Sequence, residues 1–231
     1  MTNNSQPPLP VPQVPIREAD KQLFASINSF VYEYMSKYDN SHDYQHILRV
    51  LSNTNRILQA ELKANPSVAY DTTPLFLAAL LHDVGDHKYA KPGEDAENQI
   101  ANTLLQHSAS SELATKVQAI VKNLSYSHEV RDPARVASAM AQHPELAIVQ
   151  DADRLDAIGA VGIARCFSFG AAKMPEQPMD RAISHFEEKL YNLAGMMKTA
   201  AGKDMASRRH KVLEEFAKEW KGETELSLEL Q

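Results

Sequence analysis

Apolar residues recur at three- and four-residue steps along most of this chain, which is the spacing of one face of an α-helix. The first stripe consists of Leu23, Ile27, Phe30, Val31 and Tyr34. Further helices are expected over roughly residues 43–63, 94–107, 111–123 and 144–165, and two long amphipathic helices close the chain. No segment alternates with period two over any length, so the pattern predicts an all-α fold.

One predicted helix is apolar on every side. Thr73-Pro74 offers an N-cap and a proline at the first helical position, and seven residues without a polar side chain follow, Leu75 to Leu81. A helix without a polar face is expected in the middle of the core. His82 and Asp83 come directly after it.

Composition sets the domain organisation. The chain has 231 residues, 43% of them hydrophobic and only 8 of them glycine, which favours one bundle of about eight to ten helices over residues 17–222. Five of the 12 prolines lie within the first 15 residues, so residues 1–16 are expected to form a disordered Pro-rich tail. Residues 223–231 are expected to form a C-terminal tail.

The net charge and the length of the apolar segments argue against nucleic acid and membranes as binding partners. A net charge of −6 gives no general basic field for nucleic acid, and no apolar run approaches the ~20 residues that span a bilayer. The start of the chain does not resemble a signal peptide, and Cys166, the single cysteine, has no internal partner. We expect an intracellular, cytoplasmic protein without membrane or nucleic-acid partners. The amphipathic stripes suit either a homodimer interface or packing within one chain.

His82 and Asp83 need a reason for standing beside an apolar helix, because burying unpartnered polar groups costs several kcal/mol. A hydrogen-bonded pair or a helix cap is one explanation. Adjacent residues on a helix point about 100° apart, so they bond each other poorly but both reach one ion at the helix end. A metal ion is therefore the second explanation.

Two more polar groups interrupt apolar helices. His46 lies beside the stripe of residues 43–63, with Arg49 three residues further on; His42, four residues before His46, is left open as a ligand or part of a capping cluster. Asp151 and Asp153 are about 200° apart on the helical wheel, so one ion does not readily take both. We choose Asp153 as the ligand and Asp151 for an N-cap, an acceptor that hydrogen-bonds a ligand from behind, or a contact with a substrate hydroxyl.

The ordered set of His46, His82-Asp83 and Asp153 resembles the metal signature of the HD-domain superfamily of metal-dependent phosphohydrolases. Longer stretches resemble its small stand-alone bacterial and fungal hydrolases: His42-Asp43-x-x-His46-x-x-Arg49-Val50, residues 82–88, residues 150–160, His185-Phe186-x-x-Lys189-Leu190 and Arg208-Arg209-His210. The likeness covers about residues 20–220. It implies an all-helical fold around one divalent ion, with nucleotides as the usual substrates.

The donor types suggest the ion and the chemistry. Two imidazoles and two carboxylates suit a transition-metal dication, Mn²⁺ first and then Fe²⁺, Ni²⁺ or Zn²⁺, with Mg²⁺ a weaker candidate. An ion with open positions activates water and stabilises charge on a phosphoryl group. We expect a nucleoside triphosphate pyrophosphohydrolase or a nucleotidase acting on a small phosphorylated substrate.

The remaining site residues follow from the resemblance and from charge. Asp86 matches a place where related enzymes handle protons, and an ordinary turn aspartate is the alternative. Arg49, Lys88 and Arg154 are candidates to hold phosphate oxygens. Asp151, His185 and Lys189 are candidates for substrate contact. A solvated surface charge is the alternative reading for each cation.

Two other functions also agree with the sequence. The HD scaffold also carries cyanamide-hydratase-like proteins and di-iron oxygenases, and the latter would need additional histidines such as His87 and His128 and a second iron. The third possibility is a nucleotide-sensing module with a structural metal. Metal stoichiometry and activity on cyanamide separate these from a phosphohydrolase.

Overall fold

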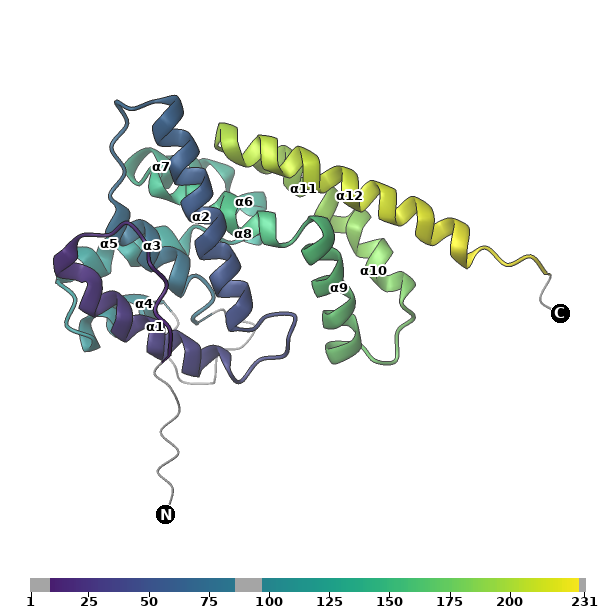
Figure 1. The fold of residues 1–231 in the computed structure, drawn as a ribbon, viewed down its shortest axis with the longest axis horizontal. Helices are drawn as coiled ribbons and strands as arrows, with labels where there is room; N and C mark the ends of the chain where they lie inside the picture. The colour runs from purple at the N-terminus through teal and green to yellow at the C-terminus, as the bar shows by residue number, and fades with distance from the viewer. Residues whose placement is uncertain (1–8, 86–96, 229–231) are drawn as a thin grey trace, which may run out of the picture.

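The computed structural model describes residues 9–85 and 97–228, and all of its regular elements in those ranges are helical (Figure 1). They are η1 (Glu18–Asp20), α1 (Lys21–Met35), α2 (Tyr44–Ala64), α3 (Thr72–Leu81), α4 (Gln99–Gln106), α5 (Ser111–Lys122), α6 (Tyr126–Arg131), α7 (Pro133–Gln142), α8 (Glu145–Asp156), α9 (Gly159–Lys173), α10 (Asp180–His185), the π-helical turn η2 (Phe186–Leu190), α11 (Tyr191–Leu193), η3 (Ala194–Met196) and α12 (Ala200–Thr224). The all-α prediction is confirmed.

The apolar helix α3 lies at the centre of the bundle. Every side chain from Thr73 to Leu81 is buried, and α3 packs against α1, α2, α5 and α8. Its helical hydrogen bonding ends at Leu81, so His82 occupies the C-cap position. The polar pair His82-Asp83 therefore enters the interior where the helical hydrogen bonding of α3 ends, as the sequence predicts.

The single helix expected over 144–165 is wrong, because the chain turns sharply between α8 and α9. The two helices are bent by 67° at the break. Gly159 begins α9 with φ +75°, a left-handed conformation that favours glycine. A Cβ on Gly162 would lie 2.3 Å from the carbonyl carbon of Ala157, so the second glycine lets α9 approach the end of α8 closely.

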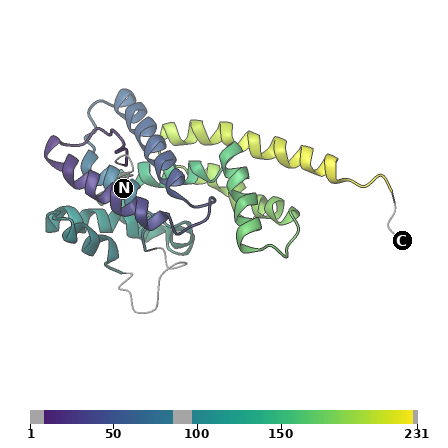
Figure 2. The same ribbon diagram turned by 60° about the horizontal axis from the view of Figure 1, so that its bottom comes forward.

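The C-terminal elements form a layer beside the first eight helices. In Figures 1 and 2, α12 runs alongside α8 and α9 and its far end projects past them, and α12 packs against α2, α8 and α9. The first of the two long helices expected here is instead divided into α10, η2, α11 and η3. The second is α12, which continues two residues past the expected boundary at 222.

The proline-rich segment is only partly a free tail. Residues 9–16 have no helix, but Leu9, Val11, Val14 and Ile16 pack against the core. The Pro10 carbonyl also accepts a 3.5 Å hydrogen bond from Asn28 Nδ2. The disordered tail expected over residues 1–16 therefore does not extend over residues 9–16, because their apolar side chains find partners on the bundle; residues 1–8 lie outside the described ranges.

Within residues 9–85 and 97–228, no single helix is both long and apolar enough to cross a bilayer. Only α8 and α9 taken together pass that test of length and composition, as a bent pair.

Candidate metal centre

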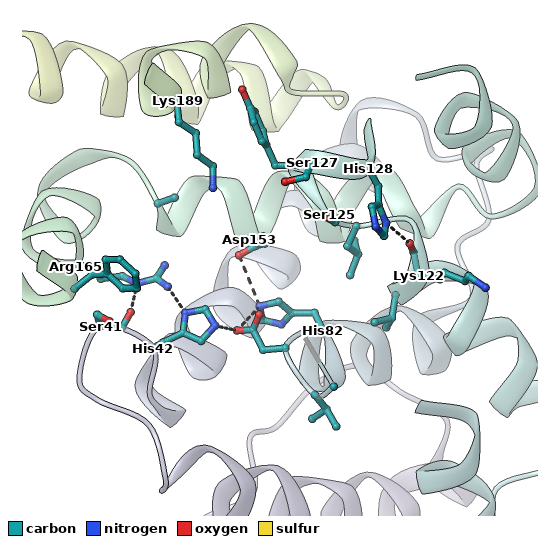
Figure 3. A pocket seen from close by; sticks show the side chains of 18 of the residues that line it. Ser41, His42, His82, Lys122, Ser125, Ser127, His128, Asp153, Arg165 and Lys189 are labelled. Carbon is teal, nitrogen blue, oxygen red and sulfur yellow. Dashed lines mark hydrogen bonds and ion pairs between the residues drawn. The ribbon is translucent and has the colours of Figure 1, made fainter. Parts of the chain in front are cut away.

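The structure brings together the four residues that the sequence suggests as metal ligands. His46 comes from α2, His82 and Asp83 follow α3, and Asp153 comes from α8. The Nε2 atoms of His46 and His82 are 3.0 Å apart. Asp83 Oδ2 is 3.1 Å and 3.2 Å from these two nitrogens, and Asp153 Oδ1 is 3.7 Å from each. Figure 3 shows Asp153 above His82 at the wall of a cavity.

Hydrogen bonds on the far side of each ring fix the histidine tautomers. His46 Nδ1 lies 2.7 Å from Asp156 Oδ2, and His82 Nδ1 lies 2.9 Å from the carbonyl oxygen of Ala79. A carbonyl or carboxylate oxygen accepts hydrogen bonds, so each Nδ1 carries the ring hydrogen. In the neutral rings, both Nε2 lone pairs therefore point at each other and at the two carboxylates.

Four electron-rich atoms in a buried site repel one another unless a positive charge lies among them, which either a proton on a histidine or a metal ion supplies. Burial lowers the pKa of His82, but the charges of Asp83 and Asp153 and the hydrogen bond with Asp83 raise it to about 9. Burial also raises the pKa of Asp83, yet the charges of His82 and His42 hold it well below its usual range. The two nitrogens and two oxygens lie close enough together to hold a divalent metal ion.

Asp156 supports His46 from behind and is itself held by two arginines. Its side chain is 2% exposed. Arg49 donates from Nε and Nη2 at 2.8 Å and 3.1 Å, and Arg165 donates from Nη1 at 3.0 Å. Burial raises the pKa of Asp156, but the hydrogen bonds from His46 and Arg49 together with the charges of His46 and Arg165 hold it well below its usual range, so this carboxylate is ionised.

This geometry gives Arg49 a partner inside the protein and adds no support for its suggested phosphate contact. The sequence suggests that Arg49 holds a phosphate, but its guanidinium forms a bidentate pair with Asp156, and it does not line the cavity beside the cluster. Arg165, which sequence reasoning missed, does line that cavity. The available signal was a single arginine in an otherwise apolar stretch of a predicted helix, three residues after Gly162.

His42, left open as a ligand, faces the cluster differently from His46. Its ring stacks on that of His46 with centroids 5.0 Å apart, its Nε2 is 2.8 Å from Asp83 Oδ2, and its Nδ1 is 3.1 Å from Arg165 Nη2. Arginine has no acceptor, so Nδ1 accepts and the ring hydrogen is on Nε2, on the side of Asp83. In this tautomer Nε2 carries the hydrogen, although by distance His42 also forms with His46 and Asp83 a group of side chains that could hold an ion. Asp43 caps α2 by accepting from the amides of Gln45 and His46.

Asp151 lies on the other side of α8 from Asp153, as the helical wheel implied. Its carboxylate is fully buried and accepts from the amides of Lys198 and Thr199 at 2.9 Å and 2.8 Å and from Thr199 Oγ1 at 2.7 Å. A Cβ on Gly202 would lie 2.2 Å from Asp151 Oδ2, so that glycine makes room for the carboxylate. Asp151 thus anchors the start of α12, and the geometry gives no support for a substrate contact.

Arg154 is also used inside the protein. Its side chain is 3% exposed, and it donates to Glu129 Oε2 at 2.5 Å and to the Met196 carbonyl at 3.1 Å. Lys198 Nζ pairs with the other oxygen of Glu129. Because these partners occupy the guanidinium away from the cavity lining, the phosphate contact suggested for Arg154 gains no support here.

The cavity beside the cluster has a volume of about 760 Å³. His82, Asp83 and Asp153 form part of one wall, and His185 and Lys189, both suggested as substrate contacts, line it as well. Figure 3 shows the Lys189 side chain extending toward Asp153, and its Nζ lies 5.1 Å from the centroid of the Tyr126 ring. Asp86 and Lys88 lie outside the described residues, so their suggested roles stay predictions.

Comparison with known proteins places this arrangement in a family. The family model described as HD domain matches residues 43–158, which contain all four residues of the cluster. The chain is 33% identical over 195 residues to the uncharacterized protein YpgQ of Bacillus subtilis (strain 168), covering 84% of this chain and 89% of that protein. This chain belongs to the HD domain family.

Solved structures agree with this assignment. The Bacillus subtilis YpgQ structure in complex with ADP matches with a TM-score of 0.65 and 29% identity, covering 88% of this chain and 95% of that one. A Lactobacillus plantarum protein matches with a TM-score of 0.71 and 29% identity over 90% and 98% of the two chains. A Bacillus thuringiensis protein described as an HD-superfamily hydrolase matches with a TM-score of 0.64 and 30% identity over 88% and 97%.

Proposed function

We propose that this protein is a metal-dependent phosphohydrolase that acts on nucleotides or related small phosphorylated metabolites. The observation that carries the proposal is the convergence of two histidine lone pairs and two carboxylate oxygens at the wall of a large cavity. His46, His82, Asp83 and Asp153 are the proposed ligands, and Mn²⁺ is the proposed ion. A divalent ion in such a site activates water and draws charge from a phosphoryl oxygen.

The cavity suits a nucleotide in size and charge. Its volume of about 760 Å³ falls in the usual range for small-molecule sites, roughly 300–1,000 Å³. Lys189 extends toward Asp153 from the opposite wall (Figure 3), where its ammonium group would bind phosphate oxygens held near the ion. His185 also lines the cavity, and burial lowers its pKa, which favours a neutral ring at pH 7. The ADP bound to YpgQ supports a nucleotide ligand for this chain as well.

The test is a panel of nucleoside mono-, di- and triphosphates and small phosphate esters, assayed with Mn²⁺ and other divalent ions after treatment with EDTA. Release of pyrophosphate would indicate a pyrophosphohydrolase, and release of orthophosphate a nucleotidase or phosphatase. We expect His82→Ala and Asp153→Ala to abolish turnover. The matched controls are His210→Ala and Asp204→Ala on α12, which are outside the cavity lining.

Two results would contradict the proposal in different ways. If the protein binds one ion per chain but hydrolyses no phosphorylated compound, the metal centre is supported and the phosphohydrolase function is refuted. Hydration of cyanamide would then be the next assay. Two ions per chain by elemental analysis would instead favour di-iron chemistry.

A further inference from the structure

We propose that Arg165 is a positioning residue that aligns two of the metal ligands at once, His46 through Asp156 and Asp83 through His42. The proposal rests on the metal centre in the proposed function, but not on the substrate or the reaction. Arg165 belongs to α9, outside the residues matched by the HD family model. None of the four proposed ligands comes from that helix.

The guanidinium of Arg165 joins two separate parts of the chain. Nε donates to the carbonyl of Ser41 at 2.7 Å, in the loop before α2. Nη1 donates to the carbonyl and to Oδ2 of Asp156 at 3.2 Å and 3.0 Å, at the end of α8. Nη2 lies 3.1 Å from His42 Nδ1. Figure 3 shows the contacts with Ser41 and His42 at one side of the cluster.

Counting hydrogens separates this role from phosphate binding. A guanidinium has five N–H donors, and the contacts above direct four of them at protein acceptors. The side chain is also only 16% exposed. One hydrogen at most remains for a ligand in the cavity. A guanidinium that binds phosphate would instead direct several of its hydrogens at the ligand.

The two branches reach the cluster through fixed tautomers. Asp156 accepts from Arg165 and from His46 Nδ1, which keeps the His46 lone pair on Nε2. By donating to His42 Nδ1, Arg165 keeps the hydrogen of that ring on Nε2, 2.8 Å from Asp83 Oδ2. The planar fork thus sets the orientation of one nitrogen ligand and one oxygen ligand, which a flexible ammonium group cannot do.

The experiment measures metal binding rather than turnover. Full-length wild type, Arg165→Gln, Arg165→Lys and Arg49→Gln are freed of metal, and the affinity for Mn²⁺ is measured by calorimetry together with the absorption spectrum of the Co²⁺-loaded protein. Arg208→Gln, an exposed arginine paired with Asp204, is the control. Thermal unfolding of each variant in EDTA reports any general loss of stability.

We expect both Arg165 variants to bind Mn²⁺ about 10–100-fold more weakly, the size typical of groups that orient metal ligands, and to alter the Co²⁺ spectrum. Arg49→Gln, which among the described residues removes bonds to Asp156 alone, should have the smaller effect, and Arg208→Gln none. Wild-type affinity and spectrum in Arg165→Gln would overturn the proposal. So would full rescue by Arg165→Lys, since the charge alone would then suffice.

A second variant keeps the test decisive if the Arg165 variants do not fold. His42→Phe retains a ring against His46 but removes both nitrogens, and we expect it to weaken Mn²⁺ binding and shift the Co²⁺ spectrum. Unchanged binding would overturn the branch through Asp83. If wild type binds neither ion, the metal centre itself is refuted, whereas a failure to hydrolyse nucleotides leaves this result intact.

Discussion

His46 Nδ1 and Asp156 Oδ2 lie 2.7 Å apart although 110 residues separate them in the chain. This contact joins the start of α2 to the end of α8 and directs the free nitrogen of His46 into the metal cluster. A carboxylate in this position also increases the basicity of the ring, and so strengthens its bond to a metal. The contact is therefore expected to contribute to metal affinity.

Asp156→Asn is expected to reduce the affinity for Mn²⁺ about 10–100-fold, because it weakens the bond that orients His46. Calorimetric titration of the metal-free protein measures the change. Asp204→Asn, which alters an exposed aspartate paired with Arg208, is the control and should leave the affinity unchanged. Equal affinities in Asp156→Asn and wild type would show that His46 is held by packing alone.

Asp151→Ala and Asp153→Ala are expected to fail in different ways. Asp151→Ala leaves the amides of Lys198 and Thr199 without their acceptor, so we expect a loss of about 2–4 kcal/mol in the free energy of unfolding. Asp153→Ala should cost little stability in EDTA but should abolish the increase in melting temperature caused by Mn²⁺. Urea unfolding with and without the ion separates the two. If Asp151→Ala instead abolished the effect of Mn²⁺ and Asp153→Ala lowered the stability in EDTA, Asp151 would be the metal ligand and Asp153 the structural residue.

The environment of Glu129 predicts how the stability of the protein depends on pH. Burial raises its pKa, but the hydrogen bonds from Lys198 and Arg154 lower it below the ordinary value of 4.5. When the pKa of a carboxyl group is lower in the folded protein than in the unfolded chain, the ionised carboxylate stabilises the fold at pH values above the unfolded pKa. This stabilisation is lost as the pH falls through the folded-state pKa. At pH 7 we expect Glu129→Gln to lower the free energy of unfolding by about 1.5–3 kcal/mol, the size of a hydrogen bond to a charged group.

The difference in the free energy of unfolding between wild type and Glu129→Gln should then become smaller as the pH falls below about 4.5. Chemical denaturation at a series of pH values measures it. Glu215→Gln, at an exposed position of α12, should show no such convergence. A difference that stays constant down to pH 3 would mean that the charge of Glu129 does not stabilise the fold.

Gly162→Ala is expected to destabilise the protein by about 1–3 kcal/mol, because the new Cβ would overlap the carbonyl group of Ala157 and move α9 away from α8. The same shift should weaken Mn²⁺ binding, since Arg165 is on α9. Gly170→Ala is the matched control in the same helix: a Cβ there meets nothing within 4 Å, and alanine should stabilise the helix by up to about 1 kcal/mol. Similar melting temperatures for the two variants would contradict the close approach.

Local sequence pattern was sufficient for much of the fold. The apolar stripes and the all-apolar α3 follow from side-chain periodicity, which depends only on neighbours in the chain. The same periodicity put Asp151 and Asp153 on opposite sides of one helix, and the resemblance in residue order gave the four members of the cluster. The helix boundary at Leu81 followed from the change from apolar to polar residues.

Tertiary structure decided what each polar side chain contacts. Arg49 and Arg154 carry the charge that a phosphate requires, but whether a guanidinium meets a ligand or an internal carboxylate depends on residues far away in the chain, here Asp156 and Glu129. The break at Gly159 and the inward position of Arg165 likewise result from how closely α9 approaches α8. The sequence alone determined most of the helical segments and the donor types, because both are local. Packing decided where two of the expected helices break and which donors meet, because hydrogen bonding depends on distance and direction between segments that the chain does not connect directly.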